Sequence, residues 1–199
     1  MDVMERGRGR IEVVAGPMFA GKTEELLRRV RRAVIGGRAV ELFTHALDTR
    51  QGSGVVASHA GLEHASREVS SAAEIADLVP EGTDIVAIDE AHFFGAELVP
   101  VVEELAGRGV VVIVGGLAVT FAGRPFEPLP SLMAVAERVD RLTAICTVCG
   151  EDAVFHQRIE PVSAGDTDLV AEHVGGAEKY EARCRRHFDP AGGSHGGDA

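Results

Sequence analysis

The stretch GPMFAGKT, from Gly16 to Thr23, decides the fold of this chain. It fits the pattern G-x-x-x-x-G-K-[ST] and lies between an apolar run at 11–15 and a segment of helical periodicity at 23–35. Glycines let such a loop wrap so that its N–H groups point at phosphate oxygens, and the helix N-terminus adds partial positive charge. We therefore predict a nucleoside triphosphate site that consists of Gly16, Pro17, Met18, Phe19, Ala20, Gly21, Lys22 and Thr23. Within it, Lys22 would reach the β- and γ-phosphates and the Thr23 hydroxyl would ligate Mg²⁺.

Outward from this loop, short apolar strands alternate with helices. The patterns predict strands at 11–15, 40–44, 55–57, 84–88 and 110–114, and helices at 23–35, 71–79, 97–107 and 130–139. The strands at 84–88 and 110–114 carry apolar residues on both faces, which is typical of a parallel sheet covered by helices on both sides. The expected fold class is therefore α/β.

The stretch IVAIDEAHFF, residues 85–94, is a strand that ends in two carboxylates. Folds with a phosphate loop place the Asp that positions Mg²⁺ at such a strand end, so we assign this role to Asp89. Glu90 is the candidate general base, and the strand alone leaves open whether it acts on water or on a substrate hydroxyl. The letters DEAH also mark a class of helicases, but a helicase needs a second motor domain that 199 residues cannot supply.

Composition limits the partners of the chain. The net charge is −11, whereas proteins that grip phosphate backbones usually present a basic face, so nucleic acid is not an expected partner. No apolar run reaches the roughly 18 to 20 residues of a membrane span, and the start MDVMERGRGR does not resemble a secretory signal. We expect a cytoplasmic protein without a membrane partner.

Two pairs of residues with two-residue spacers lie in the C-terminal third. They are Cys146 and Cys149, then Cys184 and His187. Together they would form a closed Cys₃His tetrahedron, a structural Zn²⁺ site that clips the base of a long loop. The competing interpretations are free cysteines beside a surface histidine, or redox chemistry at the first pair, which lacks a thioredoxin-like βαβ context.

The order of these motifs closely resembles that of type II thymidine kinases, the type found in human cytosol and many bacteria. The match extends from about Ile11 to His187 and includes GPMFAGKT, DEAHFF, GLAVTFAGRPFEPLPSL, AICTVCG and VGGAEKYEARCRRH. The resemblance implies a RecA-like core, a small zinc-binding domain and a lasso loop that closes over the nucleoside. It also implies transfer of the ATP γ-phosphate to the 5′-hydroxyl of thymidine, with ATP and Mg²⁺, by a homotetramer.

The resemblance also assigns roles to residues. Glu90 would be the general base on the 5′-hydroxyl, Asp89 would orient Mg²⁺, and Arg50 would lie near the phosphates. The nucleoside pocket would be lined by Met18, Leu117, Phe121, His156, Val174 and Tyr180. Of these residues, Val174 and Tyr180 correspond to positions in the lasso loop of the family.

The motifs divide the chain into four predicted parts. These are an N-terminal extension at 1–10, a phosphate-loop ATP-binding kinase domain at 11–142, a zinc-binding and lasso domain at 143–188, and a disordered tail at 189–199.

Several residues depart from the family pattern. His92 replaces the usual Gln, Ala118 replaces Asp, and His156 replaces a Thr that faces the base. His187 replaces the commoner Cys among the zinc ligands and should preserve binding. Because the other departures concentrate around the nucleoside pocket, they leave open a related pyrimidine deoxynucleoside kinase with a shifted base preference, such as deoxyuridine. A separate alternative is a non-catalytic nucleotide-binding regulatory protein, against which the intact Lys22, Thr23, Asp89 and Glu90 argue.

Overall fold

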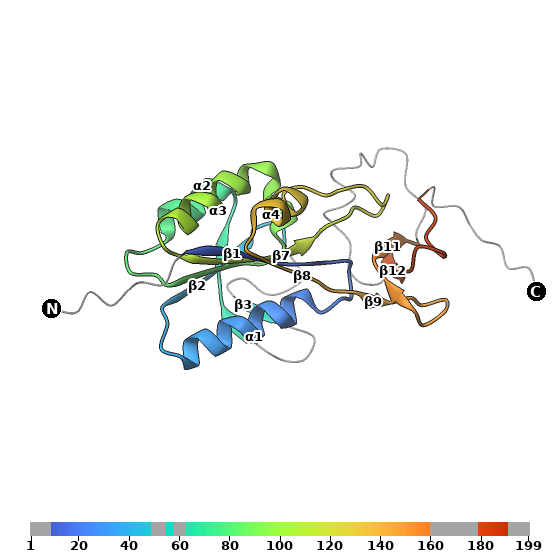
Figure 1. Cartoon of the computed structure of the whole chain (residues 1–199), viewed down its shortest axis with the longest axis horizontal. Helices are drawn as coiled ribbons and strands as arrows, with labels where there is room; N and C mark the ends of the chain where they lie inside the picture. Colours follow the sequence, from blue (N-terminus) through green and yellow to red (C-terminus); the bar gives the residue numbers. More distant parts are fainter. Residues whose placement is uncertain (1–8, 49–54, 58–62, 160–178, 191–199) are drawn as a thin grey trace, which may run out of the picture.

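The computed structural model describes residues 9–48, 55–57, 63–159 and 179–190 (Figure 1). Its centre is one sheet whose strands, in spatial order, are β5 (Arg67–Val69), β2 (Val40–His45), β6 (Ile85–Ile88), β7 (Val111–Leu117), β1 (Arg10–Gly16) and β8 (Arg138–Arg141). Every pairing in this sheet is parallel. The carboxyl ends of all six strands therefore lie at one edge of the sheet, where ligands bind in open α/β folds.

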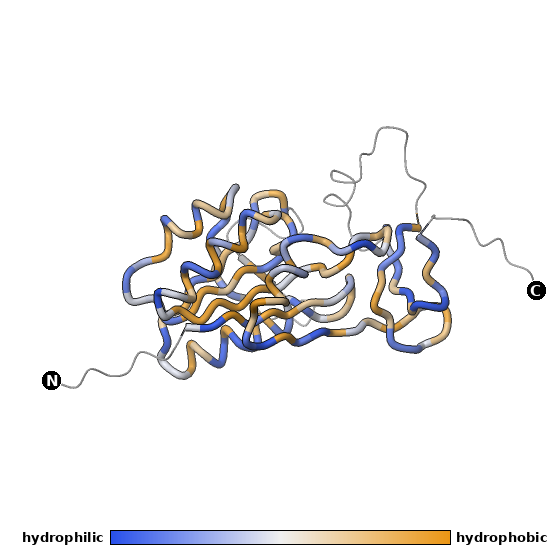
Figure 2. The backbone as a smooth tube through the Cα atoms, turned by 45° about the horizontal axis from the view of Figure 1, so that its top comes forward, coloured by the Kyte–Doolittle hydropathy of each residue, from blue (hydrophilic) through white to orange (hydrophobic). Residues whose placement is uncertain are grey.

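Helices cover both faces of the sheet, as the sequence predicts. Helix α1 (Lys22–Ile35) lies on one face, and α2 (Ala72–Leu78), α3 (Leu98–Gly107) and α4 (Leu129–Val135) lie on the other (Figure 1). Val13 and Val14 of β1 are both fully buried but belong to different core clusters. The central strands therefore run as continuously apolar segments between two polar-surfaced helical layers (Figure 2).

Smaller elements complete the described chain. One is the 3₁₀ segment η1 (Ala91–Glu97). The others are three antiparallel strand pairs: β3 (Val55–Ala57) with β4 (Glu63–Ala65), β9 (Ala144–Ile145) with β10 (Asp152–Ala153), and β11 (Phe155–Arg158) with β12 (Tyr180–Arg183). In the part of the chain described, no helix has the length and apolar character that a membrane crossing requires.

The predicted helix at 130–139 is wrong in its second half. Helix α4 ends at Val135, and residues 138–141 form β8, which pairs with β1 at the edge of the sheet. The segment lacks an apolar signal because only one side of an edge strand is paired, and its charged residues remain largely exposed. Strand β7 also continues beyond the predicted end at 114, through Gly115 and Gly116 to Leu117.

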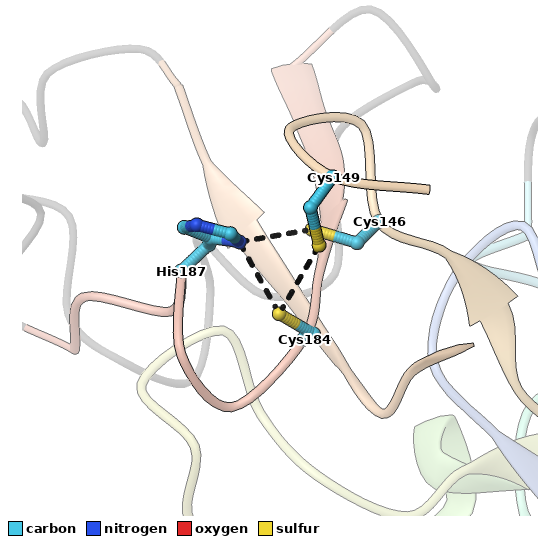
Figure 3. A group of neighbouring side chains, drawn as sticks. All are labelled: Cys146, Cys149, Cys184 and His187. Atoms are coloured by element: carbon cyan, nitrogen blue, oxygen red, sulfur yellow. Dashed lines mark hydrogen bonds between the residues drawn. The ribbon is translucent and has the colours of Figure 1, made fainter. Parts of the chain in front are cut away.

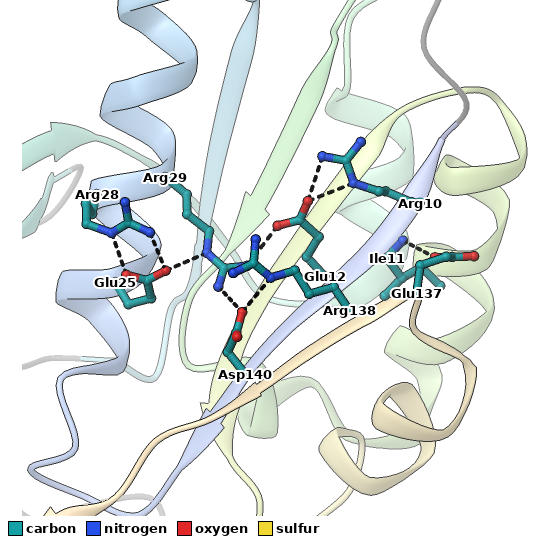
Figure 4. A network of polar contacts seen from close by, with 9 residues as sticks. All are labelled: Arg10, Ile11, Glu12, Glu25, Arg28, Arg29, Glu137, Arg138 and Asp140. Atoms are coloured by element: carbon teal, nitrogen blue, oxygen red, sulfur yellow. Dashed lines mark hydrogen bonds and ion pairs between the residues drawn. The ribbon is translucent and has the colours of Figure 1, made fainter.

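A buried cluster of charges joins α1 to β1 and β8 (Figure 4). Arg29 of α1 is only 8% exposed and donates to Glu12 and Glu25 at 2.8 Å each, and it also pairs with Asp140. A hydrogen bond from Arg28, together with Arg29 and against the effect of burial, lowers the pKa of Glu25 to about 2. Glu25 therefore stays ionised at neutral pH, and the ion pairs of Arg29 join the helix that follows the phosphate loop to β1 and β8.

We predict that Arg29→Met lowers the free energy of unfolding by about 3 kcal/mol or more, because it leaves carboxylates without their buried partner. The matched control is Arg28→Met, which removes an arginine that is 52% exposed and pairs with the same Glu25. That variant should lower the free energy of unfolding much less, because an exposed ion pair contributes little to stability. Urea denaturation measures both, and equal losses would contradict the structural role of Arg29.

Candidate active site and metal centre

The phosphate loop connects β1 directly to α1. Phe19 and Gly21 have positive φ values of 67° and 80°, and the N-terminus of α1 has no side-chain cap. A Cβ on Gly16 would lie 2.8 Å from the Leu142 carbonyl oxygen, so this position requires glycine. The ammonium of buried Lys22 donates to the Pro17 carbonyl at 2.8 Å. The loop thus keeps its lysine against its own backbone and leaves the first N–H groups of the helix open to an anion.

Thr23 and Asp89 meet at the carboxyl edge of the sheet. The Thr23 hydroxyl donates to Asp89 Oδ2 at 2.8 Å, and Asp89 Oδ1 accepts the N–H of Glu90 at 3.0 Å. Glu90 is 5% exposed and adopts a left-handed backbone conformation with φ of 49°. Two residues that the sequence assigns to a metal ion and one that it assigns to proton transfer are therefore adjacent.

Glycines in β7 make this arrangement sterically possible. A Cβ on Gly115 would lie 3.2 Å from Asp89 Oδ1, and one on Gly116 would lie 3.2 Å from the backbone nitrogen of Ala91 and 2.8 Å from Leu129 Cδ2. Sequence reasoning did not assign a role to this pair. The signal was present as two glycines directly after an apolar strand, a position where another part of the chain often approaches closely.

A further buried group, His156, interacts with Glu90. His156 of β11 is 3% exposed and packs edge-on against Tyr180 of β12, with ring centroids 5.7 Å apart. Burial lowers the pKa of His156 to about 3, with smaller effects from Lys22 and His92, while Glu90 opposes the shift. The imidazole is therefore neutral at pH 7, and its Nδ1 is buried without a hydrogen-bond partner.

The remaining predicted pocket residues occupy several positions. Leu117 is buried at the end of β7, and Met18 is half-buried in the phosphate loop. Phe121 is half-buried in a turn that is closed by the hydrogen bond from Gly123 N–H to the Thr120 carbonyl. Arg50 and Val174 lie outside the described residues.

Cys146, Cys149, Cys184 and His187 converge in the structure, with their ligand atoms within 4.8 Å of one another (Figure 3). The Cys149 and Cys184 sulfurs are 3.8 Å apart, and His187 Nδ1 lies 3.7 Å from the Cys146 sulfur and 3.3 Å from the Cys184 sulfur. A tetrahedron with usual zinc distances has edges of about 3.8 Å between sulfurs and about 3.6 Å between sulfur and nitrogen. The four groups fit Zn²⁺.

The chemistry of Cys146 also suits a metal thiolate. Burial raises its pKa, but backbone N–H groups of Cys184, Val148 and Cys149 point at the sulfur, and with His187 they lower the pKa to about 5. Metal-bound cysteine is deprotonated, so donors that favour the thiolate also favour metal binding.

The metal centre is packed against the phosphate loop. A small core formed by Ala144, Cys146, Ala153 and Ala182 contacts Ala20 of that loop and Cys184. Phe188 stacks on Phe155, with ring centroids 4.3 Å apart. A Cβ on Gly123 would lie 2.7 Å from the ring of Phe188. Phe188, which directly follows His187, thus contacts both β11, the strand of His156, and the turn that contains Phe121.

A family model described as thymidine kinase matches residues 9–188. The chain belongs to the thymidine kinase family. A thymidine kinase of Halobacterium salinarum is 50% identical over 183 residues, covering 89% of this chain and 92% of that protein. Thymidine kinases of Bdellovibrio bacteriovorus and Deinococcus radiodurans are each 45% identical, covering 92% and 93% of this chain and 87% and 92% of those proteins. The family resemblance seen in the motifs is thereby confirmed.

We predict about one zinc per chain by elemental analysis, as one four-ligand site requires. Cys149→Ser should lower the zinc content and open residues 144–188 to limited proteolysis, because ligated zinc contributes on the order of 10 kcal/mol to folding of small sites. Arg186→Ala is the matched control, since Arg186 is exposed in the same turn as two ligands. Metal-free wild-type protein that resists protease equally well would contradict a structural zinc.

Proposed function

We propose that this chain is a thymidine kinase that transfers the γ-phosphate of ATP to the 5′-hydroxyl of thymidine. Membership of the family supports the reaction. The observation that carries the assignment is the contact between Thr23 and Asp89 beside the buried Glu90, because it joins the phosphate loop to a carboxylate pair at the ligand edge of the sheet. Intact catalytic groups argue against a non-catalytic regulatory role.

The phosphate loop, Gly16 to Thr23, would bind the triphosphate through its backbone N–H groups and the N-terminus of α1. Lys22 would exchange its contact with the Pro17 carbonyl for the β- and γ-phosphates. Arg50, outside the described residues, completes the proposed set of cations near the phosphates. Because phosphoryl transfer depends mostly on positioning and charge neutralisation, these groups would position the ATP and neutralise the charge of its phosphates.

Thr23 and Asp89 are the residues that would hold Mg²⁺. Their oxygens are hard ligands 2.8 Å apart, one at the start of α1 and the other directly after β6, and Mg²⁺ in kinases is held by a few such groups together with substrate phosphates. Mg²⁺ held there would neutralise charge on the β- and γ-phosphate oxygens.

Glu90 would accept the proton of the 5′-hydroxyl as its oxygen attacks the γ-phosphorus. Its backbone is held by the Asp89 side chain, so the base is fixed next to the residue that would hold the metal ion. Its burial keeps water away from the carboxylate, which favours transfer to the nucleoside over hydrolysis of ATP.

The proposed nucleoside pocket consists of Met18, Leu117, Phe121, His156 and Tyr180 with Val174 from outside the described residues. His156 presents an unpartnered Nδ1 in a buried setting, which a hydrogen-bonding group of the base could satisfy. An imidazole also takes more space than the Thr of the family pattern. This observation favours a second candidate, the same reaction with a preference shifted toward deoxyuridine, which lacks the 5-methyl group.

The proposal extends to the assembly and its setting. A cytoplasmic homotetramer follows from the family resemblance, and the net charge of −11 supports the absence of a nucleic-acid partner. The zinc would be structural, since all four positions of its tetrahedron are protein ligands.

We predict that Glu90→Gln lowers kcat by about 100-fold or more, the usual contribution of a positioned base. Binding of ATP should change little, because the phosphate loop and Asp89 are untouched. Glu97→Gln, at an exposed glutamate seven positions on, is the matched control and should retain activity. A phosphate-transfer assay with labelled ATP measures both, and near-normal turnover of Glu90→Gln would exclude Glu90 as the base.

We predict that His156→Thr raises the ratio of thymidine to deoxyuridine kcat/KM by about 10-fold, because one methyl group is worth about 1–3 kcal/mol in discrimination. The KM for ATP should stay constant and serves as the internal control. An unchanged ratio would show that His156 does not determine the base preference.

A further inference from the structure

His92 is a buried imidazole with two neighbours at the same nitrogen. Its Nδ1 lies 3.4 Å from Glu90 Oε2 and also accepts the N–H of Leu117 at 3.4 Å. Its side chain is 3% exposed and that of Glu90 is 6% exposed. Both groups therefore interact largely out of contact with water, where hydrogen bonds to a charged group are strong.

The ring of His92 is held in a fixed orientation. It packs against Phe93 and Phe126, with centroid distances of 4.5 Å and 5.1 Å. Leu117 is the last residue of β7, so its N–H belongs to the rigid sheet. The imidazole is consequently anchored on three sides, with the carboxylate of Glu90 at its Nδ1.

A single nitrogen cannot serve both neighbours in the same way. With its proton on Nε2, Nδ1 accepts from the Leu117 N–H; with a proton on Nδ1, it donates to the Glu90 carboxylate. The tautomer with its proton on Nδ1 therefore suits Glu90 in its ionised form, the form that accepts a proton from a hydroxyl.

We propose that His92 is a positioning residue that holds the Glu90 carboxylate in its reactive orientation through Nδ1. This rests on the proposed role of Glu90 as the base. His92 does not contact the reacting atoms in this arrangement and acts through the carboxylate. A glutamine at this position also offers an N–H donor to the Glu90 carboxylate, whereas a leucine offers none.

The test compares His92→Leu with His92→Gln in the full-length, zinc-containing protein. His92→Leu should lower kcat by about 10-fold to 100-fold, the effect of misplacing a catalytic group, with less than about a twofold change in KM for ATP. His92→Gln should recover most of kcat. Equal losses in both variants, or no loss in His92→Leu, would overturn the proposal.

The matched control is His45→Leu, which removes another buried imidazole. His45 packs edge-on against Phe94 with centroids 4.7 Å apart, and its Nδ1 accepts the Leu47 N–H at 3.1 Å. His45→Leu and His92→Leu should lower the melting temperature similarly, whereas only His92→Leu should lower kcat. A similar fall in kcat in His45→Leu would mean that lost packing, and not lost positioning, explains the effect.

A double-mutant cycle separates this inference from the proposed function. If His92 acts through Glu90, the double variant His92→Leu with Glu90→Gln should be no slower than Glu90→Gln alone. A loss from His92→Leu that multiplies fully with that of Glu90→Gln would overturn the role of His92 and leave Glu90 as the base. Near-normal turnover in Glu90→Gln would instead overturn the assignment of the base itself.

Discussion

The absence of side chains at Gly115 and Gly116 is the steric constraint on which the active-site geometry depends. These residues lie at the centre of the sheet, where β7 is flanked by β1 and β6. Asp89 comes within 3.2 Å of where a Cβ of Gly115 would be, and the backbone of Ala91 approaches Gly116 equally closely. Any larger residue would push the carboxylate pair away from Thr23. The arrangement of Thr23, Asp89 and Glu90 therefore depends on close backbone packing as well as on polar contacts.

The second constraint is the path of the chain after β8. Leu142 lies beside the start of the phosphate loop, with its N–H bonded to the Ala15 carbonyl at 2.8 Å and its carbonyl against Gly16. The chain then enters the metal centre, whose core contacts Ala20. The cluster of Cys146 and Cys184 and the phosphate loop consequently share one packed region, and Arg29 pairs with Asp140 of β8 just before the chain enters it.

The sequence was most informative where chemistry requires particular residues at particular spacings. GPMFAGKT and the two zinc pairs fall into this class, and so does the alternation of apolar strands with helices. It was least informative where contacts decide the outcome. Strand β8 is polar because it lies at an edge, β7 runs through glycines that serve packing, and β5 is only three residues long. The contact between His92 and Glu90 depends on the 3₁₀ geometry of η1 and on the end of β7, neither of which spacing reveals.

The position of β1 also determines when the protein can fold. This first strand is hydrogen-bonded on one side to β7 and on the other to β8, with Arg10 opposite Val111 and Glu12 opposite Arg138. During synthesis, β1 leaves the ribosome long before β7 and β8, so it cannot form its native pairing until they have been made. Such non-local parallel pairing is slow and leaves apolar strands exposed meanwhile. The nascent chain should need shielding from aggregation until residue 141 has emerged, so efficient production of this enzyme should depend on chaperone capacity as well as on its final stability.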